Sequence, residues 1–223
     1  MSILIASVNL QFHCIEYLST FAEKIMRTEV YLFLFLLTYF FFVFFLRSYL
    51  LWKRTGLNPL TFNKTDDAHG YNGKVFTFIS LSEFGVVAIY AFKNEWYQYL
   101  LPFWYLEHDY LKYIGWSLLV LSLILVWVAQ SQMANSWRIG IDEVNKTKLV
   151  TNGLYALSRN PIFLGVMIAN IGLMLIIPNA FTLLIVSLST VSINTQIRLE
   201  EEFLKRSHGE IYNNYFNDVR RWL

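Results

Sequence analysis

The stretch LVTNGLYALSRNPIFLG at residues 149–165 contains groups suited to binding an anion. Asn160 precedes Pro161, so a helix is expected to begin at Pro161 with Asn160 as its cap. The first N–H groups of that helix and the positive end of its dipole would face the preceding loop, where Arg159 adds a forked donor. These groups together would bind a carboxylate or a phosphate. An ordinary capped membrane helix with an arginine at the interface is the alternative interpretation.

A second group of candidates lies where the last apolar segment becomes charged. Arg198, Glu200 and Glu201 would emerge on the side of the membrane that holds the helix start at Pro161. Carboxylates at that position suit a ribose hydroxyl or a cation. Charged pairs four residues apart, such as Glu201 and Lys205, support a simpler interpretation, in which exposed ion pairs worth about 0.2–0.5 kcal/mol each stabilise a helix surface.

Glu83 lies inside the second long apolar segment. A carboxylate at that depth is expensive, so it is expected to face the interior of the helix bundle and to have a partner there. It is a candidate functional residue, and a hydrogen bond to a hydroxyl or amide of a neighbouring helix explains it equally well. The pair Asp66-Asp67 lies in a turn-rich loop, where adjacent carboxylates more often point apart, and no catalytic role is assigned to it.

Neither a metal site nor a nucleic-acid partner is expected. Cys14 is the single cysteine, which excludes an internal disulfide and most cysteine-based metal sites. The four histidines are scattered, without the close spacing that places two ligands on one metal. The net charge of +2 is too small to indicate nucleic-acid binding.

The elements that must position these residues are membrane helices. The chain is 56% hydrophobic and 15% charged with a positive mean hydropathy, which indicates an all-α, polytopic integral membrane protein. About five transmembrane helices are expected, two of them forming a hairpin around Pro178-Asn179, and their apolar segments are residues 30–52, 75–92, 111–130, 162–177 and 180–193. Residues 194–223 are expected to form an amphipathic C-terminal helix that is broken near Gly209.

Three regions follow from this pattern. Residues 1–29 form an N-terminal amphipathic segment, without the basic start of a signal peptide. Residues 30–131 contain the first three transmembrane helices, and residues 132–223 contain the loop, the hairpin and the C-terminal helix.

Lysine and arginine residues concentrate on one side of the expected bundle. The loop after the first span, the loop before the hairpin and the C-terminal tail carry 13 of them, against 4 on the other side. The positive-inside rule makes the first side cytosolic. The candidate site and the C-terminus would therefore face the compartment that holds soluble nucleotide cofactors, in a bacterial inner membrane or an endoplasmic reticulum depending on the host.

Two motifs carry a family resemblance. Residues 149–165 resemble the cofactor-binding stretch of the isoprenylcysteine carboxyl methyltransferase family, whose usual form is close to LVTxGxYxxxRHPxYxG. Residues 200–223, EEEFLKRSHGEIYNNYFNDVRRWL, are similar to its C-terminal signature, EExxLxxxFGxxYxxYxxxVxR. The resemblance covers roughly the last ninety residues, and this family of membrane methyltransferases is related to the phospholipid methyltransferases.

The resemblance implies transfer of a methyl group from S-adenosylmethionine to a lipophilic acceptor within the lipid bilayer. It assigns cofactor binding to matched positions of both motifs, namely Leu149, Val150, Gly153, Tyr155, Arg159, Asn160, Pro161, Phe163, Gly165, Glu200 and Glu201. Two positions depart from the family pattern. Asn160 replaces a histidine and Phe163 replaces a tyrosine, so one ring donor and one hydroxyl are missing.

The resemblance favours a carboxylate acceptor and O-methylation of the isoprenylcysteine type. Such an acceptor is already ionised, so positioning supplies most of the rate, and Arg198 would orient the anion. An amine acceptor, as in phospholipid or small-amine N-methylation, must be neutral to attack, and Glu201 would take its proton. Arg198 and Glu201 are therefore the predicted catalytic residues. An NADPH-dependent membrane reductase, whose C-terminal half looks related, and a non-catalytic relative are the other open functions.

Overall fold

A computed structural model describes residues 28–56, 67–137 and 148–223. Within these ranges the regular elements are helices, and the one β-bridge joins Pro102 to Asn179. This confirms the predicted all-α architecture. The predictions made for the N-terminal amphipathic segment up to residue 27, and for Asp66, fall outside the described residues.

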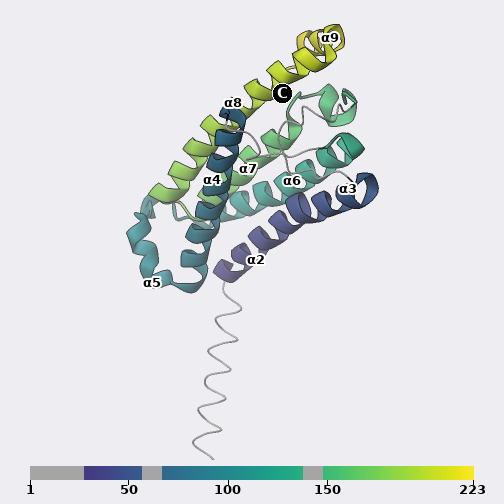
Figure 1. The fold of residues 1–223 in the computed structure, drawn as a ribbon. Coiled ribbons are helices and arrows are strands. Elements are labelled where there is room, and N and C mark those ends of the chain that lie inside the picture. Colours follow the sequence, from purple (N-terminus) through teal and green to yellow (C-terminus); the bar gives the residue numbers. More distant parts are fainter. Residues whose placement is uncertain (1–27, 57–66, 138–147) are drawn as a thin grey trace, which may run out of the picture.

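Four helices are long and apolar enough to cross a membrane (Figure 1). The first is continuous through α2 (Thr28–Phe40), the π-helical segment η1 (Phe41–Leu46) and α3 (Arg47–Thr55), and the others are α4 (Ala68–Phe92), α6 (Asp109–Met133) and α8 (Ala180–His208). α7 (Pro161–Ile176) is a shorter apolar helix of 16 residues, about 24 Å long at 1.5 Å per residue. The chain is a multi-pass membrane protein.

The C-terminal part differs from the sequence prediction in one respect. The predicted span 180–193 and the first part of the predicted amphipathic helix after it, up to residue 208, form one unbroken helix, α8. No glycine or proline interrupts residues 180–208, so nothing stops the helix at the membrane surface. The predicted break near Gly209 is confirmed, because Gly209 has φ +56° and separates α8 from α9 (Glu210–Asp218).

α6 and α7 form the closest helix pair of the described bundle, because glycines face each other across it. A Cβ atom on Gly115 of α6 would lie 2.6 Å from the carbonyl oxygen of Gly172 on α7. Further along the pair, the Ser122 hydroxyl donates to the Gly165 carbonyl oxygen at 2.7 Å, and Tyr39 of α2 contacts Ser122 at 3.1 Å. Small residues and short polar groups join membrane helices in this way.

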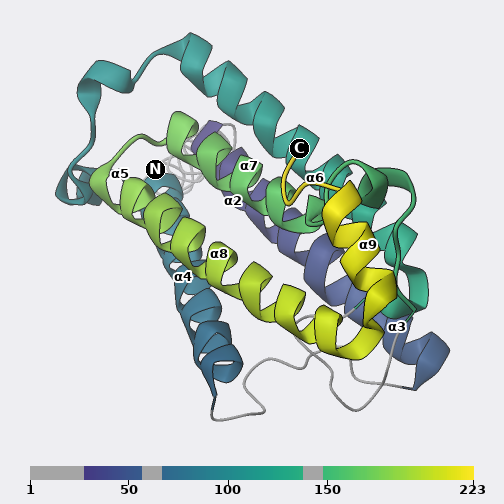
Figure 2. The same cartoon turned by 90° about the horizontal axis from the view of Figure 1, so that it is seen from above.

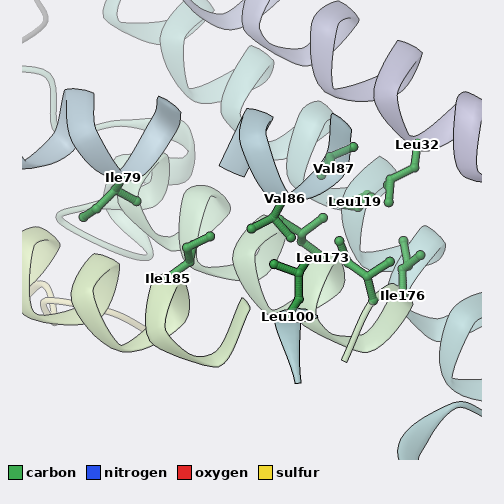
Figure 3. Close-up of a cluster of buried hydrophobic side chains, with 10 residues drawn as sticks. Leu32, Ile79, Val86, Val87, Leu100, Leu119, Leu173, Ile176 and Ile185 are labelled. Carbon is green, nitrogen blue, oxygen red and sulfur yellow. The ribbon is translucent and has the colours of Figure 1, made fainter. Parts of the chain in front are cut away.

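The main apolar core lies at the end of the bundle away from α9. Leu32, Ile79, Val86, Val87, Leu100, Leu119, Leu173, Ile176 and Ile185 are among its buried members, and they come from five helices and the short turn η2 (Gln98–Leu100) (Figure 3). The turn between α7 and α8 closes this end, where Asn179 and Thr182 form a reciprocal cap and Asn179 pairs with Pro102. Leu32, Ile79, Leu119 and Leu173 of this core also line the cavity described below.

Candidate functional site

A cavity of about 840 Å³ lies among the long helices and reaches the end of the bundle at which α9 packs. Its wall includes residues of α2, η1, α3, α4, α6, α7, α8 and α9, and of the loop before α7. In Figure 2, α9 lies beside this loop, so segments far apart in the sequence meet at one end of the bundle. The volume is within the range of about 300–1,000 Å³ that small-molecule sites occupy.

Most of the predicted site residues meet at this cavity. Those that line it are Leu149, Val150, Tyr155, Arg159, Asn160, Pro161, Phe163, Glu200 and Glu201. The two motifs, separate in the sequence, thus form one wall. Gly153, Gly165 and Arg198 do not line it. Arg198 is exposed and its guanidinium donates to the carbonyl oxygen of Asn194 on its own helix, so the predicted orienting role finds no support in its position.

Glu201 is the centre of a buried ion-pair network. Its side chain lies 2.9 Å from Nη2 of Arg159 and 2.6 Å from Nη2 of Arg221, and each arginine also donates a second bond through Nε. These hydrogen bonds raise the pKa of the Arg221 guanidinium. Both carboxylate oxygens of Glu201 are therefore engaged by arginines, which opposes the predicted role as a proton acceptor in this conformation.

Arg159 uses its remaining donors on the C-terminal tail. Nη1 donates to the carbonyl oxygens of Phe216, at 2.8 Å, and of Val219, and the guanidinium carbon lies 4.1 Å from the centre of the Phe216 ring. The backbone N–H of Arg159 donates to the carbonyl oxygen of Arg220 at 2.9 Å. Arg159, which the sequence predicted to bind an anion, thus uses these donors to hold the tail against the start of α7.

α7 begins at Pro161, as predicted, but Asn160 is not its side-chain cap. The Asn160 Nδ2 group instead donates to the carbonyl oxygen of Arg221 at 3.1 Å, and its backbone N–H donates to the Ser158 hydroxyl. The sequence pattern predicted that the Asn160 side chain would cap α7, but this side chain bonds to the Arg221 carbonyl oxygen of the tail. Asn160 therefore contributes to the docking of the tail, at a position where the related family has histidine.

The motif glycines shape the site without lining it. Gly153 has φ +63°, a left-handed conformation that favours glycine, and the following N–H, of Leu154, donates to Gln132 Oε1 at 2.8 Å. Gly165 faces Val126 of α6, whose side chain occupies the space that a Cβ would need. Each glycine permits a close approach that places its neighbours at the cavity.

Several buried polar atoms of the cavity wall have no hydrogen-bond partner in the described structure. They are Tyr155 Oη, Gln130 Oε1, Asn170 Nδ2 and Ser48 Oγ. Burial raises the pKa of the Tyr155 hydroxyl, which keeps this group a donor at neutral pH. Unpaired buried polar groups are costly, so their presence around one cavity indicates a polar ligand. Among them only Tyr155 belongs to one of the two motifs. The sequence analysis did not identify Asn170, although a polar residue inside an apolar helix could have indicated a functional position.

Glu200 is oriented toward the cavity by an amide network between α4 and α8. It accepts a hydrogen bond from Gln196 Nε2 at 2.9 Å, and Asn72 Nδ2 donates to Gln196 Oε1 at 3.1 Å. The Ser192 hydroxyl donates to Asn72 at 2.7 Å and completes the link between the two helices. A carboxylate has about four acceptor positions, so Glu200 retains capacity for ligand donors.

Glu83 lines the same cavity and is 8% exposed. The predicted orientation toward the bundle interior is confirmed. The predicted partner is not found, because in the described part of the chain no hydrogen bond or ion pair to the Glu83 carboxylate is present. The part of the chain that the structure describes also contains no cluster of three histidine, cysteine or acidic residues suited to a metal ion.

Residues 111–211 match the family model described as phospholipid methyltransferase. No curated protein and no solved structure is significantly similar to the chain. The matched region contains α6, the loop before α7, the α7–α8 hairpin and the start of α9, and thus most of the wall formed by the two motifs. The match agrees with the relationship expected from the motifs: residues 111–211 of this chain are similar to the phospholipid methyltransferase family, which is related to the isoprenylcysteine carboxyl methyltransferases.

Proposed function

We propose that the chain transfers a methyl group from S-adenosylmethionine to a lipophilic acceptor inside this cavity. The family match indicates a membrane methyltransferase. The observation that carries the finer proposal is the wall shared by both motifs, on which Glu200 and the Tyr155 hydroxyl face one cavity. A bound S-adenosylmethionine would supply a methyl group activated by its sulfonium.

The residues of the wall match the polar groups of this cofactor. Glu200 suits the ribose hydroxyls or the amino group, because it is an acceptor with capacity left. Tyr155 Oη suits the cofactor's carboxylate, because it is a buried donor without a partner. Arg159 and Glu201 contribute by holding the tail over the site through their ion pair.

The acceptor would reach the cavity from the lipid. Phe41 and Phe45 of η1 line the cavity while 46% and 65% exposed, and Thr77 of α4 is also both lining and exposed. The lateral opening therefore lies between the first and second spans. Transfer itself needs alignment, since the acceptor atom must attack the methyl carbon in line as the bond to sulfur breaks and sulfur keeps the electron pair.

The distribution of the basic residues supports a cytosolic location for this end of the bundle. Of the 13 lysine and arginine residues counted on this side, Lys148, Arg159 and Arg221 lie in or beside the cavity wall. By the positive-inside rule, the cofactor would arrive from the cytosol and the acceptor from the membrane.

Calorimetric titration of S-adenosylhomocysteine, the transfer product, into detergent-purified protein tests the proposal. The wild type is expected to show saturable binding, and Glu200→Gln is expected to weaken it at least about tenfold, the worth of a hydrogen bond to a charged group. Arg198→Ala is the control, since Arg198 is exposed and outside the wall, and it should bind like the wild type. Absence of binding to folded wild type, or stabilisation by NADPH in its place, would refute the proposal and favour the reductase.

A further inference from the structure

The connection between α4 and α6 carries exposed aromatic side chains at the end of the bundle away from α9 (Figure 1). It runs through α5 (Asn94–Tyr97), η2 and η3 (Trp104–Leu106). Four of its rings are more than half exposed and form what we call the aromatic surface, namely Trp96, Tyr99, Trp104 and Tyr105. The connection precedes the region that matches the family model, and none of its residues, all of which the structure describes, lines the cavity.

α7 is too short to cross a bilayer. Its 16 residues extend about 24 Å, whereas the hydrocarbon core of a bilayer is about 30 Å thick. α7 begins at Pro161, at the end of the bundle where the cavity opens. Measured from that boundary, the turn between α7 and α8 lies about 6 Å inside the opposite boundary. α4 and α6, with 25 residues each, are long enough to reach it.

The α7–α8 turn is accordingly buried, and Asn179 is 0% exposed. Irregular backbone at membrane depth must find its hydrogen-bond partners within the protein. The connection supplies two of them. The N–H of Phe103 donates to the Pro178 carbonyl oxygen at 2.9 Å, and the N–H of Ala180 donates to the Leu101 carbonyl oxygen at 3.2 Å. The inner side of the connection therefore covers the turn.

The outer side of the connection has the composition of a membrane–water interface. Tryptophan and tyrosine combine an apolar ring with a polar tip, and both are enriched at that depth in membrane proteins. Lys93 Nζ lies 5.9 Å from the centre of the Trp96 ring and 3.9 Å from the Glu95 carboxylate. A group of exposed rings gains nothing from contact with water alone, and hydrocarbon would leave the hydroxyl, indole N–H and charged groups without partners.

We propose that the aromatic surface binds the lipid–water interface of the leaflet opposite the candidate site and holds the α7–α8 turn at a fixed depth beneath it. Lipid is the partner because the flanking lysines already pair within the chain, Lys93 with Glu95 and Lys112 with Asp109, which leaves the rings as the main groups for a partner to contact. The depth of the turn in turn sets the depth of Pro161 at the other end of α7.

Quenching of tryptophan fluorescence by spin-labelled lipids tests the proposal. The full chain is reconstituted in phosphatidylcholine nanodiscs that carry a nitroxide either on the headgroup or near the end of an acyl chain. Subtracting the spectrum of Trp104→Phe from that of the wild type gives the emission of Trp104, which is 78% exposed. The headgroup label should quench this emission at least about twofold more than the chain label.

Trp116→Phe is the matched control. Trp116 lies seven residues after Asp109, the first residue of α6, and is therefore about 10 Å further along the helix toward the bilayer centre. Its emission should be quenched more by the chain label than by the headgroup label. Iodide, which remains in water, is added to parallel samples as a third quencher.

Stronger quenching of Trp104 by the headgroup label, with the opposite order for Trp116, supports the proposal. Quenching of Trp104 by iodide alone would place the aromatic surface in water, and protection from all three quenchers would indicate a second copy of the chain against it. Either result overturns the proposal, as does stronger quenching of Trp104 by the chain label. If Trp104→Phe fails to fold, the same subtraction with Trp96→Phe provides the decision, because Trp96 belongs to the same surface.

Discussion

Replacing Glu201 with alanine should release the C-terminal tail from the cavity. The substitution leaves Arg159, whose side chain is 7% exposed, without its carboxylate partner, whereas Arg221 is 31% exposed and can turn to water. Breaking a buried ion pair from one side costs about 3–5 kcal/mol. Arg159 keeps the carbonyl oxygens of Phe216 and Val219, so we expect the lower end of that range, about 3 kcal/mol.

Hydrogen exchange of α9 and residues 219–223 measures this effect directly. A loss of about 3 kcal/mol corresponds to exchange faster by on the order of 100-fold if the tail opens locally. Glu202→Ala is the matched control, because Glu202 is the next residue and is exposed, and its exchange should equal that of the wild type. Equal protection of α9 in Glu201→Ala and Glu202→Ala would refute the reasoning.

A double-mutant cycle distinguishes the ion pair from general disruption. Arg159→Met removes the buried charge that Glu201→Ala leaves unpaired, so the double variant should lose less than the two single variants together. Additive losses would show that Arg159 and Glu201 stabilise the tail independently.

Two further predictions concern packing and the ligand. Gly165→Ala should lower the stability of the detergent-solubilised protein by about 1–3 kcal/mol, because its methyl group would meet Val126, whereas Gly85→Ala, with open space around the new Cβ, should be neutral or stabilising in the same thermal denaturation. Tyr155→Phe should leave stability unchanged, since the hydroxyl has no partner, and should weaken S-adenosylhomocysteine binding at least about fivefold; a loss of stability without a loss of binding would contradict the role given to this hydroxyl.

The sequence correctly predicted the helix boundaries that are determined by residues within about one turn of the helix. Pro161 starts α7 and Gly209 ends α8, because the geometry of proline and a positive φ act on the chain within one turn. The predicted cap at Asn160 was wrong because the acceptor that its side chain binds is distant in the sequence. Its competitor, the Arg221 carbonyl, lies 61 positions away along the chain and reaches the site only through the folded tail.

The exposed position of Arg198 follows from the helical period of α8, which places it on a different face from the cavity-lining residues of that helix. Ile193, Ile197, Glu201 and Leu204 recur at spacings of three or four residues and form the inward face, whereas Arg198 falls off that face and is exposed. Because α8 is continuous through residue 208, the same helical period applies on both sides of the predicted boundary at residue 194. The absence of a partner for Glu83 in the described part of the chain could not be predicted from the helical period. It depends on which side chains of the neighbouring helices surround α4.

The two motifs stabilise each other as well as the cavity that they line. Arg159 comes from the first, Glu201 and Arg221 from the second, and the Glu201 carboxylate pairs with both arginines only when the tail is docked. The tail in turn covers the mouth through Tyr212 and Tyr215, and the Tyr215 hydroxyl donates to the carbonyl oxygen of Tyr155 at 2.6 Å. Tyr155 is therefore positioned by the tail while its own hydroxyl has no partner. It follows that a variant that frees the tail should weaken cofactor binding even when every ligand-facing side chain is intact, so loss of binding in Glu201→Ala does not by itself make Glu201 a cofactor ligand.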